Sequence, residues 1–431
     1  MTMMAYAPPT TNDMLLIAID VAKRSHEVLV QWPSGKKKTF KLPSSHAEFI
    51  LFTDFLADQG LKVKAALEPT ADYHRTIAYW LLQHGVDVHL ASSLACARVR
   101  EALFNSWDKN DRKDAKVIMY LLAQGLTKPF HDPLLNGYMH LQELAGTYQQ
   151  ISMARTRCQH SLVNHYLPLF FPEFERYLHS NRAEWFCRFL LQFPVPRSIA
   201  SLALEAFLEQ AWELVGKKIA KQRFLTELYE MAQKSIALPI EAHAVELVPF
   251  KLQLKRYQQL TEHRNTLECL AHGLLKDNQD YLRLRTIPGI GPIIGLIILA
   301  ESGDLRRFAH HRQYLAFCGF SLSGSQSGEF QGRYRINKRG NARLRYAYWL
   351  AATVAIRQRE NSFRQKYERY IANDKESADV KRKAYCAIAI KMARVAHSLV
   401  KQECDYRGYH EAGIPGGRTR STGRGTHRGI S

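Results

Sequence analysis

Four acidic residues near the N-terminus are placed where they could hold a divalent metal ion. Asp20 and Glu68 each end an apolar run that has the pattern of a buried strand. A carboxylate at such a position is costly to bury alone and needs a partner such as a cation. Asp111 and Asp114 lie three residues apart at the start of a predicted helix, so they share one face of it.

The chemistry that these acids suggest is metal-assisted cleavage of a phosphodiester. Oxygen ligands suit Mg²⁺, with Mn²⁺ as the alternative. Two such ions at about 4 Å could clamp the attacking and leaving oxygens. Taken singly, each acid also fits an ordinary strand end or helix start. The rival acids are Asp72, Asp87 and Asp108.

A second group that could do chemistry lies in the polar stretch 319–341, GFSLSGSQSGEFQGRYRINKRGN. A hydroxyl beside cationic groups, such as that of Ser327, could act as a nucleophile in phosphoryl transfer. A plain surface loop is the competing interpretation, and Ser323, Ser325 and Tyr334 are alternative nucleophiles. The cations here that we predict to contact nucleic acid are Arg333, Arg335, Lys338, Arg339, Arg343 and Arg345.

A third candidate is the turn Ile287–Pro292, which precedes an apolar helix and resembles the turn of a helix-hairpin-helix. Gly289 and Gly291 would let the backbone approach a phosphate, and the helix start would present N–H groups to it. The alternative is an ordinary tight turn before a buried helix.

The elements that must position the acids form a mixed α/β domain over residues 14–128. Its segments read as strand, strand, strand, helix, strand, helix, strand, helix. This order predicts a mixed sheet covered by helices, as in a ribonuclease-H-like fold. The predicted segments are 15–20, 26–32, 37–41, 44–59, 63–67, 72–83, 86–90 and 111–124.

The remaining residues are predicted to be mostly helical. Residues 137–280 are poor in Gly and predict long helices, packed as an antiparallel coiled coil with an apolar seam. That seam comprises Leu254, Tyr257, Leu260, Leu267, Leu270 and Leu274. Residues 281–402 form a third, mostly helical domain that carries the serine loop, with helices at about 341–357 and 378–402. Residues 403–431 predict a basic, disordered tail.

The overall composition favours a polyanionic partner. Lys and Arg exceed Asp and Glu by 60 to 40, which gives a formal net charge of +20. The seven cysteines are scattered and indicate a reducing, cytoplasmic environment rather than a zinc ribbon. No run is long and apolar enough for a membrane span, and we expect no secretory signal.

Several motifs together resemble those of the DEDD transposases of bacterial insertion sequences, the insertion sequence 110 family. Residues 18–23 with His26, residues 68–74 and residues 109–115 are similar to that family's three acidic motifs. Residues 288–291 resemble its C-terminal domain. Gln326–Gly328, followed by Gly332, Ile336, Lys338, Gly340, Leu344 and Arg345, resembles its serine motif. Two departures are Ala71, where the family usually has Gly, and Asn110, where it usually has Thr.

The resemblance implies more than the residues show by themselves. It implies a RuvC-like N-terminal domain with Asp20, Glu68, Asp111 and Asp114 as metal ligands, and Ser327 as a nucleophile acting on DNA. It also implies a structured guide RNA from the element, and homodimers that assemble into tetramers on DNA near the nucleoid. The acids would reach the serine by folding or from a second subunit. The rival functions are a junction-resolving nuclease without a covalent step, and a non-enzymatic nucleic-acid scaffold.

Overall fold

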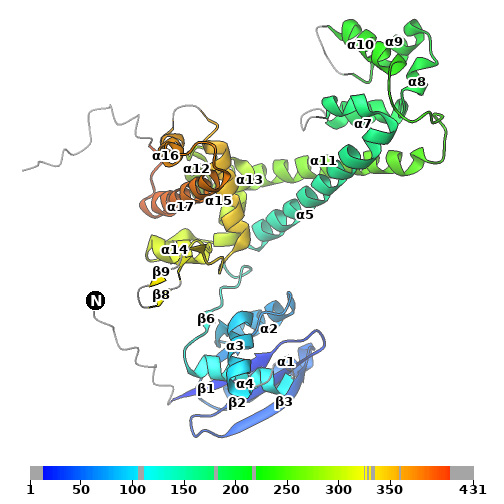
Figure 1. Cartoon of the computed structure of the whole chain (residues 1–431). Helices are drawn as coiled ribbons and strands as arrows, with labels where there is room; N and C mark the ends of the chain where they lie inside the picture. Colours follow the sequence, from blue (N-terminus) through cyan, green and yellow to red (C-terminus); the bar gives the residue numbers. More distant parts are fainter. Residues whose placement is uncertain are drawn as a thin grey trace, which may run out of the picture. The chain divides into compact units, whose positions relative to one another are not determined.

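The chain forms two compact units, which meet in sequence at Gly137 and Tyr138. The structure is a computed structural model (Figure 1). It describes residues 13–104, 111–178, 183–215, 220–324, 326–327, 330–331, 335–358 and 361–407, without the side chains of 111–112, 183, 326–327 and 330–331. None of the described helices is long and apolar enough to cross a membrane.

The N-terminal unit is built on a mixed sheet of six strands. Its strand order is β3-β2-β1-β4-β5-β6, with β1, β4 and β5 parallel to one another. The strands are β1 (Met14–Asp20), β2 (Ser25–Gln31), β3 (Lys37–Pro43), β4 (Lys62–Leu67), β5 (Asp87–Leu90) and β6 (Lys128–Pro129). The helices are α1 (His46–Ala57), α2 (Tyr73–Gln83), α3 (Ser93–Phe104) and α4 (Asp111–Ala123).

Helices cover both faces of this sheet, because the side chains of β1 alternate between two apolar cores. Leu15, Ile17 and Ile19 pack with residues of α1 and α2. Leu16 and Ala18 pack with residues of α3 and α4 on the opposite face. The buried residues of β1 are apolar on both sides for this reason, as are Ala65, Ala66 and Leu67 of β4.

The expected mixed α/β unit is confirmed, and its predicted strands and helices end within a few residues of those observed. Two elements were not predicted. Helix α3 has a sequence with little apolar periodicity and a single well-buried residue, Cys96, so its pattern carries a weak signal. Strand β6 is only two residues long and pairs with β5 at the edge of the sheet.

The C-terminal unit is organised around two long helices, α5 (Met139–Ser161) and α11 (Leu247–Leu275), which run side by side (Figure 1). Their contacts show that they are antiparallel. Tyr148 of α5 donates a hydrogen bond to Glu268 of α11. Arg155, further along α5, donates one to Tyr257, which comes earlier in α11. The predicted antiparallel helix pair is therefore present.

The predicted apolar seam of α11 differs from the observed one towards its C-terminal end. Leu270 is 52% exposed, while the neighbouring Ala271 is 0% exposed. Likewise Leu274 is exposed and Leu275 is buried. The prediction was wrong at Leu270 and Leu274, because α11 packs there against α5 and α13, and this contact turns Ala271 and Leu275 inward.

The two ends of this helix pair belong to different apolar cores. One core joins the end of α5 and the start of α11 to the intervening short helices. These are α6 (Leu167–Phe170), α7 (Ala183–Gln192), α8 (Arg197–Ala200), α9 (Leu204–Trp212) and α10 (Lys221–Gln233). The other core joins the start of α5 and the end of α11 to the last helices.

Those last helices are α12 (Gln279–Arg285), α13 (Pro292–Ser302), α14 (His311–Phe317), α15 (Ala342–Ala355), α16 (Ser362–Ile371) and α17 (Ala378–Gln402). Caps define several starts: the side chains of Asn341, Asn361 and Ser377 accept bonds from backbone N–H groups of α15, α16 and α17. Helix α16 was not predicted. The predicted tail lies almost entirely outside the described residues.

Candidate active site

The sheet brings Asp20 and Glu68 to adjacent positions. They follow Ile19 and Leu67, the last paired residues of the parallel strands β1 and β4. Neighbouring strands lie about 5 Å apart, so the two Cα atoms are separated by roughly that distance. By alternation from Ala18 and Ala66, which face α3 and α4, both acids belong to that face of the sheet.

Asp114 lies on the side of α4 that packs against the sheet, and its side chain is 1% exposed. Its Oδ1 accepts a bond of 2.6 Å from Nε of Arg100 and another of 2.5 Å from a terminal guanidinium nitrogen. Its Oδ2 is buried and has no hydrogen-bond partner among the residues that the structure describes. A buried carboxylate oxygen without a partner is costly, so it is a position suited to a cation.

Glu68 is held by a neighbour that the sequence did not indicate, the thiol of Cys96 on α3. Burial, together with the charge and hydrogen bond of Glu68, raises the pKa of Cys96 to about 12. The charge of Asp114 raises this pKa further and that of Arg100 lowers it. The thiol is therefore a neutral donor to Glu68, and the charges of Glu68, Asp114 and Arg100 all lie close enough to act on Cys96.

A further acid, Glu27, was missed. It pairs with Asp20 across β1 and β2, and it is 7% exposed. Residues opposite each other in an antiparallel pair share a face, so Glu27 lies beside Asp20. The alternation of side chains along β2 could have indicated this acid, because Glu27 and Leu29 share a face of the strand. The structure places Leu29 in the core with α4.

The carboxylate oxygens of this site are the kind of ligand that a divalent cation such as Mg²⁺ prefers. Asp114 offers an oxygen without a partner among the described residues, and Asp20 and Glu68 supply hard oxygen donors on the same face of the sheet. Asp111 begins α4 one turn before Asp114, but its side chain lies outside the described part of the structure. Among the described side chains, no group of three or more His, Cys, Asp or Glu is already arranged as a metal cage.

The turn after Glu68 contains a strained backbone conformation at Ala71. Ala71 has a φ of 44°, in the left-handed region that favours glycine. This is the position at which the resembling family usually has Gly. The replacement of Gly by Ala at position 71 therefore lies at a backbone conformation that a Cβ disfavours, four residues after the end of β4.

The expected loop around Ser327 contains short strands. Strand β7 (Leu322–Ser323) pairs with β10 (Arg335–Ile336), and between them β8 (Gln326–Ser327) pairs with β9 (Phe330–Gln331). Ser327 pairs with Phe330 near the tip. The side chain of Ser327 lies outside the described residues, as do Ser325 and Tyr334. The hydroxyl of Ser323 lies 3.5 Å from the carbonyl oxygen of Arg335.

The two ends of this hairpin are joined by a close backbone contact between Gly319 and Gly340. A Cβ on Gly340 would lie 2.4 Å from the nitrogen of Gly319. The guanidinium of Arg345 donates to the carbonyls of Cys318 and Lys338, at 3.4 and 3.3 Å. The N–H of Asn341 donates to the carbonyl of Phe317 at 2.7 Å.

The cations that we predicted to contact nucleic acid differ in their exposure and in their partners. Arg335, Lys338 and Arg339 are exposed. Arg343 forms an ion pair of 3.0 Å with Glu301, and Arg345 is engaged in the contact described above. Arg333 lies outside the described residues.

The two glycines of the turn before α13 also differ. Gly289 has a φ of 88°, and a Cβ there would lie 2.2 Å from the carbonyl oxygen of Ala351 in α15. Packing against α15 is a sufficient reason for glycine at this position. The phosphate contact expected of Gly289 and Gly291 stays a prediction. Gly291 caps the start of α13, and a Cβ there would meet open space.

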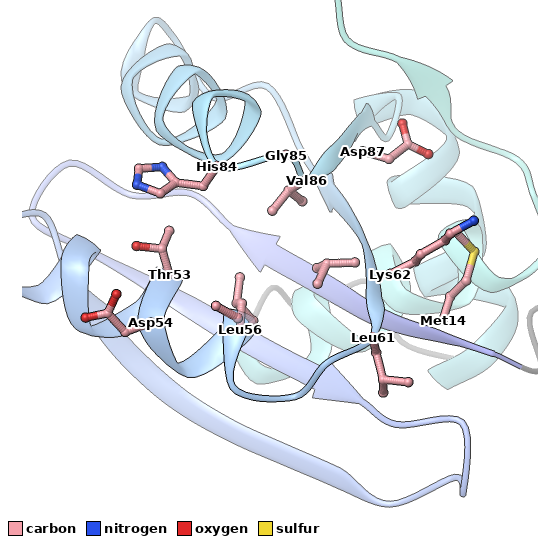
Figure 2. Close-up of a pocket in the computed structure, with 12 residues that line it drawn as sticks. Met14, Thr53, Asp54, Leu56, Leu61, Lys62, His84, Gly85, Val86 and Asp87 are labelled. Atoms are coloured by element: carbon pink, nitrogen blue, oxygen red, sulfur yellow. The ribbon is translucent and has the colours of Figure 1, made fainter.

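A hollow of about 510 Å³ in the N-terminal unit is separate from the acids (Figure 2). It lies at the start of β1, β4 and β5, where Met14, Lys62 and Asp87 line it, with Asp54 and His84 at its edge. Asp20 and Glu68 lie at the C-terminal ends of β1 and β4, whereas this hollow lies at the N-terminal ends of the same strands.

Comparisons with known proteins agree with the motifs. Residues 17–172 match the family of DEDD transposases of the IS110 type, and residues 281–368 match the Transposase IS116/IS110/IS902 family. Both matches are to one class of protein, the transposases of bacterial insertion sequences. This chain belongs to the IS110 family of transposases.

Several relatives are similar over different lengths. The chain is 27% identical to the transposase for insertion sequence element IS1111A of Coxiella burnetii over 43% of this chain and half of that relative's length. It is 26% identical to the transposase for IS1328 of Yersinia enterocolitica, over 56% of this chain and 79% of that protein. An IS110 protein of Streptomyces coelicolor is 22% identical over 94% of this chain and 98% of its own length.

Among solved structures, RuvC of T. thermophilus in complex with a Holliday junction substrate aligns with 27% of this chain and 100% of its own. The TM-score is 0.20 and the identity 11%. This likeness is too weak to bear on fold or function.

Proposed function

We propose that this protein is a DNA transposase that cleaves and rejoins DNA strands to move an insertion sequence. Its N-terminal unit would be a ribonuclease-H-like, RuvC-like catalytic domain whose metal ligands are Asp20, Glu68, Asp111 and Asp114. The observation that carries this is the buried Oδ2 of Asp114, which has no partner within the described part of the chain and lies on the face of the sheet that ends in Asp20 and Glu68. Family membership supports the DNA substrate.

The side chains around the acids have separate tasks in this proposal. Arg100 holds Asp114 by Oδ1 and leaves Oδ2 available. The neutral thiol of Cys96 orients Glu68 without adding charge. A bound Mg²⁺, or Mn²⁺ in its place, would supply Lewis-acid stabilisation of the phosphodiester oxygens.

Ser327 is the proposed nucleophile of the C-terminal unit. Its Oγ would form a bond to phosphorus as one P–O bond of the DNA backbone breaks. The serine loses its hydroxyl proton, and the released strand end leaves as a hydroxyl. Attack by the hydroxyl of another strand on the same phosphorus would then rejoin DNA and free the serine. Arg335 and Lys338, exposed on the same hairpin, are suited to stabilise the charged phosphorus centre.

The family also supports proposals about partners. We propose that a structured RNA from the element guides DNA choice by base pairing, while the protein contacts backbone and shape. Homodimers assembling into tetramers on DNA, in the cytoplasm at the nucleoid, complete the proposal.

The metal site is tested by replacing its ligands. Asp20→Asn and, separately, Asp114→Asn should abolish excision of the element from a plasmid that carries the gene with its flanking DNA. Both should also abolish the rise in melting temperature that Mg²⁺ or Mn²⁺ gives the purified protein. Asp72→Asn removes an exposed acid in the same unit and is the control. Parental excision by either ligand variant would contradict the metal site.

The nucleophile is tested by comparing Ser327→Ala with Ser325→Ala and Tyr334→Phe. Only the first should abolish strand rejoining, and mass spectrometry of a trapped protein–DNA adduct should map the phosphate to Ser327. An adduct on another residue contradicts the assignment. If the acids are essential but no adduct ever forms, the junction-resolving nuclease becomes the better description.

A further inference from the structure

A row of aromatic side chains connects three helices of the C-terminal unit. Tyr346 and Trp349 on α15 are stacked, with ring centroids 6.1 Å apart and an angle of 15° between the planes. Trp349 lies 6.2 Å from Tyr385 on α17, and Tyr385 lies 5.2 Å from Tyr367 on α16. The row therefore runs across α15, α17 and α16.

Part of this row is open to solvent. Tyr346 is 56% exposed and Trp349 is 38% exposed. Tyr370, one turn after Tyr367 on α16, is 51% exposed. Large aromatic side chains are usually more buried, so part of each of these rings is open to a ligand.

A basic hollow adjoins the row on α16. Its volume is about 880 Å³, and Lys366, Arg369 and Tyr370 line it together with Lys391 of α17. Burial, followed by the charges of Lys391, Arg394 and Arg369, lowers the pKa of Lys366. The charges that act on this amine are all positive, and no carboxylate of the described residues is among them, so positive groups are concentrated here.

The cations of this hollow differ from others on the same helices. Arg364 pairs with Glu368 on α16, and Lys383 pairs with Asp379 on α17. For Lys366, Arg369, Lys391 and Arg394, no ion pair is found within the part of the chain that the structure describes. The unpaired charges thus gather beside Tyr370, the exposed ring that lines the hollow.

We propose that this surface of α15, α16 and α17 binds single-stranded nucleic acid. Exposed rings beside a positively charged groove are the combination that such ligands require, because unpaired bases stack on aromatic faces while cations track the phosphates. A duplex keeps its bases stacked inside, so it would use the cations but not the rings. The proposal deepens the proposed function, on which it rests for nucleic acid as the partner.

The experiment measures binding by the full chain in EDTA, so that cleavage plays no part. Fluorescence anisotropy gives the Kd for labelled dT20, U20 and a 20-base-pair DNA duplex over a range of salt. One variant, Tyr346→Ala with Tyr370→Ala, removes two exposed rings. A second, Lys391→Gln with Arg394→Gln, removes two charges.

Each variant has a matched control. Tyr346→Phe with Tyr370→Phe retains the rings, and Arg364→Gln with Lys383→Gln removes two paired charges from the same helices. Circular dichroism melting verifies that all four variants fold.

The ring variant should weaken single-strand binding at least about fivefold and leave duplex binding nearly unchanged. The charge variant should reduce the slope of log K against log salt by about 1.4 for single strands, since each phosphate contributes about 0.7. The control variants should bind as the parent does. A loss with U20 alone identifies RNA as the source of the strand, and an equal loss with dT20 shows that either strand is accepted.

Three results would overturn the proposal. One is an unchanged Kd for both single strands in the two test variants. Another is an equal loss in the charge variant and its control. The third is displacement of U20 by poly-glutamate as effectively as by unlabelled U20, which would indicate an acidic protein partner. Because the readout is binding, failure here leaves the excision tests of Asp20 and Asp114 unaffected.

Discussion

At the scale of single residues, Asp114 and Arg100 form the interaction on which the acidic face most depends. Both side chains are largely buried, and Arg100 engages only one of the two carboxylate oxygens. Removing one member of a buried pair costs more than the pair contributes, because the remaining charge is left without compensation. The ion pair therefore stabilises the fold, and it also lies next to the proposed metal site.

We predict that Arg100→Met lowers the free energy of unfolding in EDTA by about 3 kcal/mol. Mg²⁺ should restore part of that loss, since a cation can compensate Asp114 in place of the guanidinium. Urea unfolding with and without Mg²⁺ measures both effects. Arg98→Met, which breaks only an exposed ion pair with Glu101, is the control and should cost less than about 1 kcal/mol. A cost as small for Arg100→Met would contradict this account.

At the scale of elements, the serine-bearing hairpin depends on its two ends rather than on its short strands. Gly319 and Gly340 touch through their backbones, and Arg345 bridges carbonyls on both sides of that contact. Strands of two residues are marginal by themselves. The position of Ser327 should therefore follow from this junction.

We predict that Gly340→Ala displaces the hairpin and reduces strand rejoining at least about tenfold. The added Cβ would lie 2.5 Å from the carbonyl oxygen of Phe317, and the φ of 151° is strained for alanine. The control is Gly273→Ala in α11, where a Cβ meets nothing within 4 Å. That change should raise stability by about 0.5–1 kcal/mol and leave rejoining unaltered. Unimpaired rejoining by Gly340→Ala would show that the junction does not position the serine.

At the scale of the whole molecule, the net charge of +20 governs association with nucleic acid. Counterion release makes such binding depend steeply on salt. The described part of the C-terminal unit contributes exposed cations on the hairpin and on α16 and α17. The tail beyond Arg407 adds four arginines, Arg418, Arg420, Arg424 and Arg428.

We predict that affinity for DNA falls by about 10³-fold or more between 50 and 200 mM salt, as expected for about six to ten phosphate contacts. Truncation after Arg407 should weaken binding modestly and leave excision active. Titrations at four or five salt concentrations give the slope for each protein. A flat response would mean that the charge excess is not used for nucleic acid.

Much of the N-terminal unit could be predicted from the sequence because strand patterns are local. Apolar runs and turn residues located β1 to β5 within a few positions, and they placed Asp20 and Glu68 at strand ends. The spacing of Asp111 and Asp114 placed both on α4. These features depend only on neighbours along the chain, which the sequence records directly.

Tertiary structure alone decided which side chains meet. Arg100 and Cys96 lie on a helix without a clear pattern, and only the packing of α3 against α4 and the sheet brings them to Asp114 and Glu68. The need for glycine at Gly289 comes from α15, more than sixty residues away in the sequence. Likewise, Ala271 rather than Leu270 faces inward because of the helices that α11 meets. Such contacts join residues distant along the chain, and steric fit between them leaves no periodic signal in the sequence.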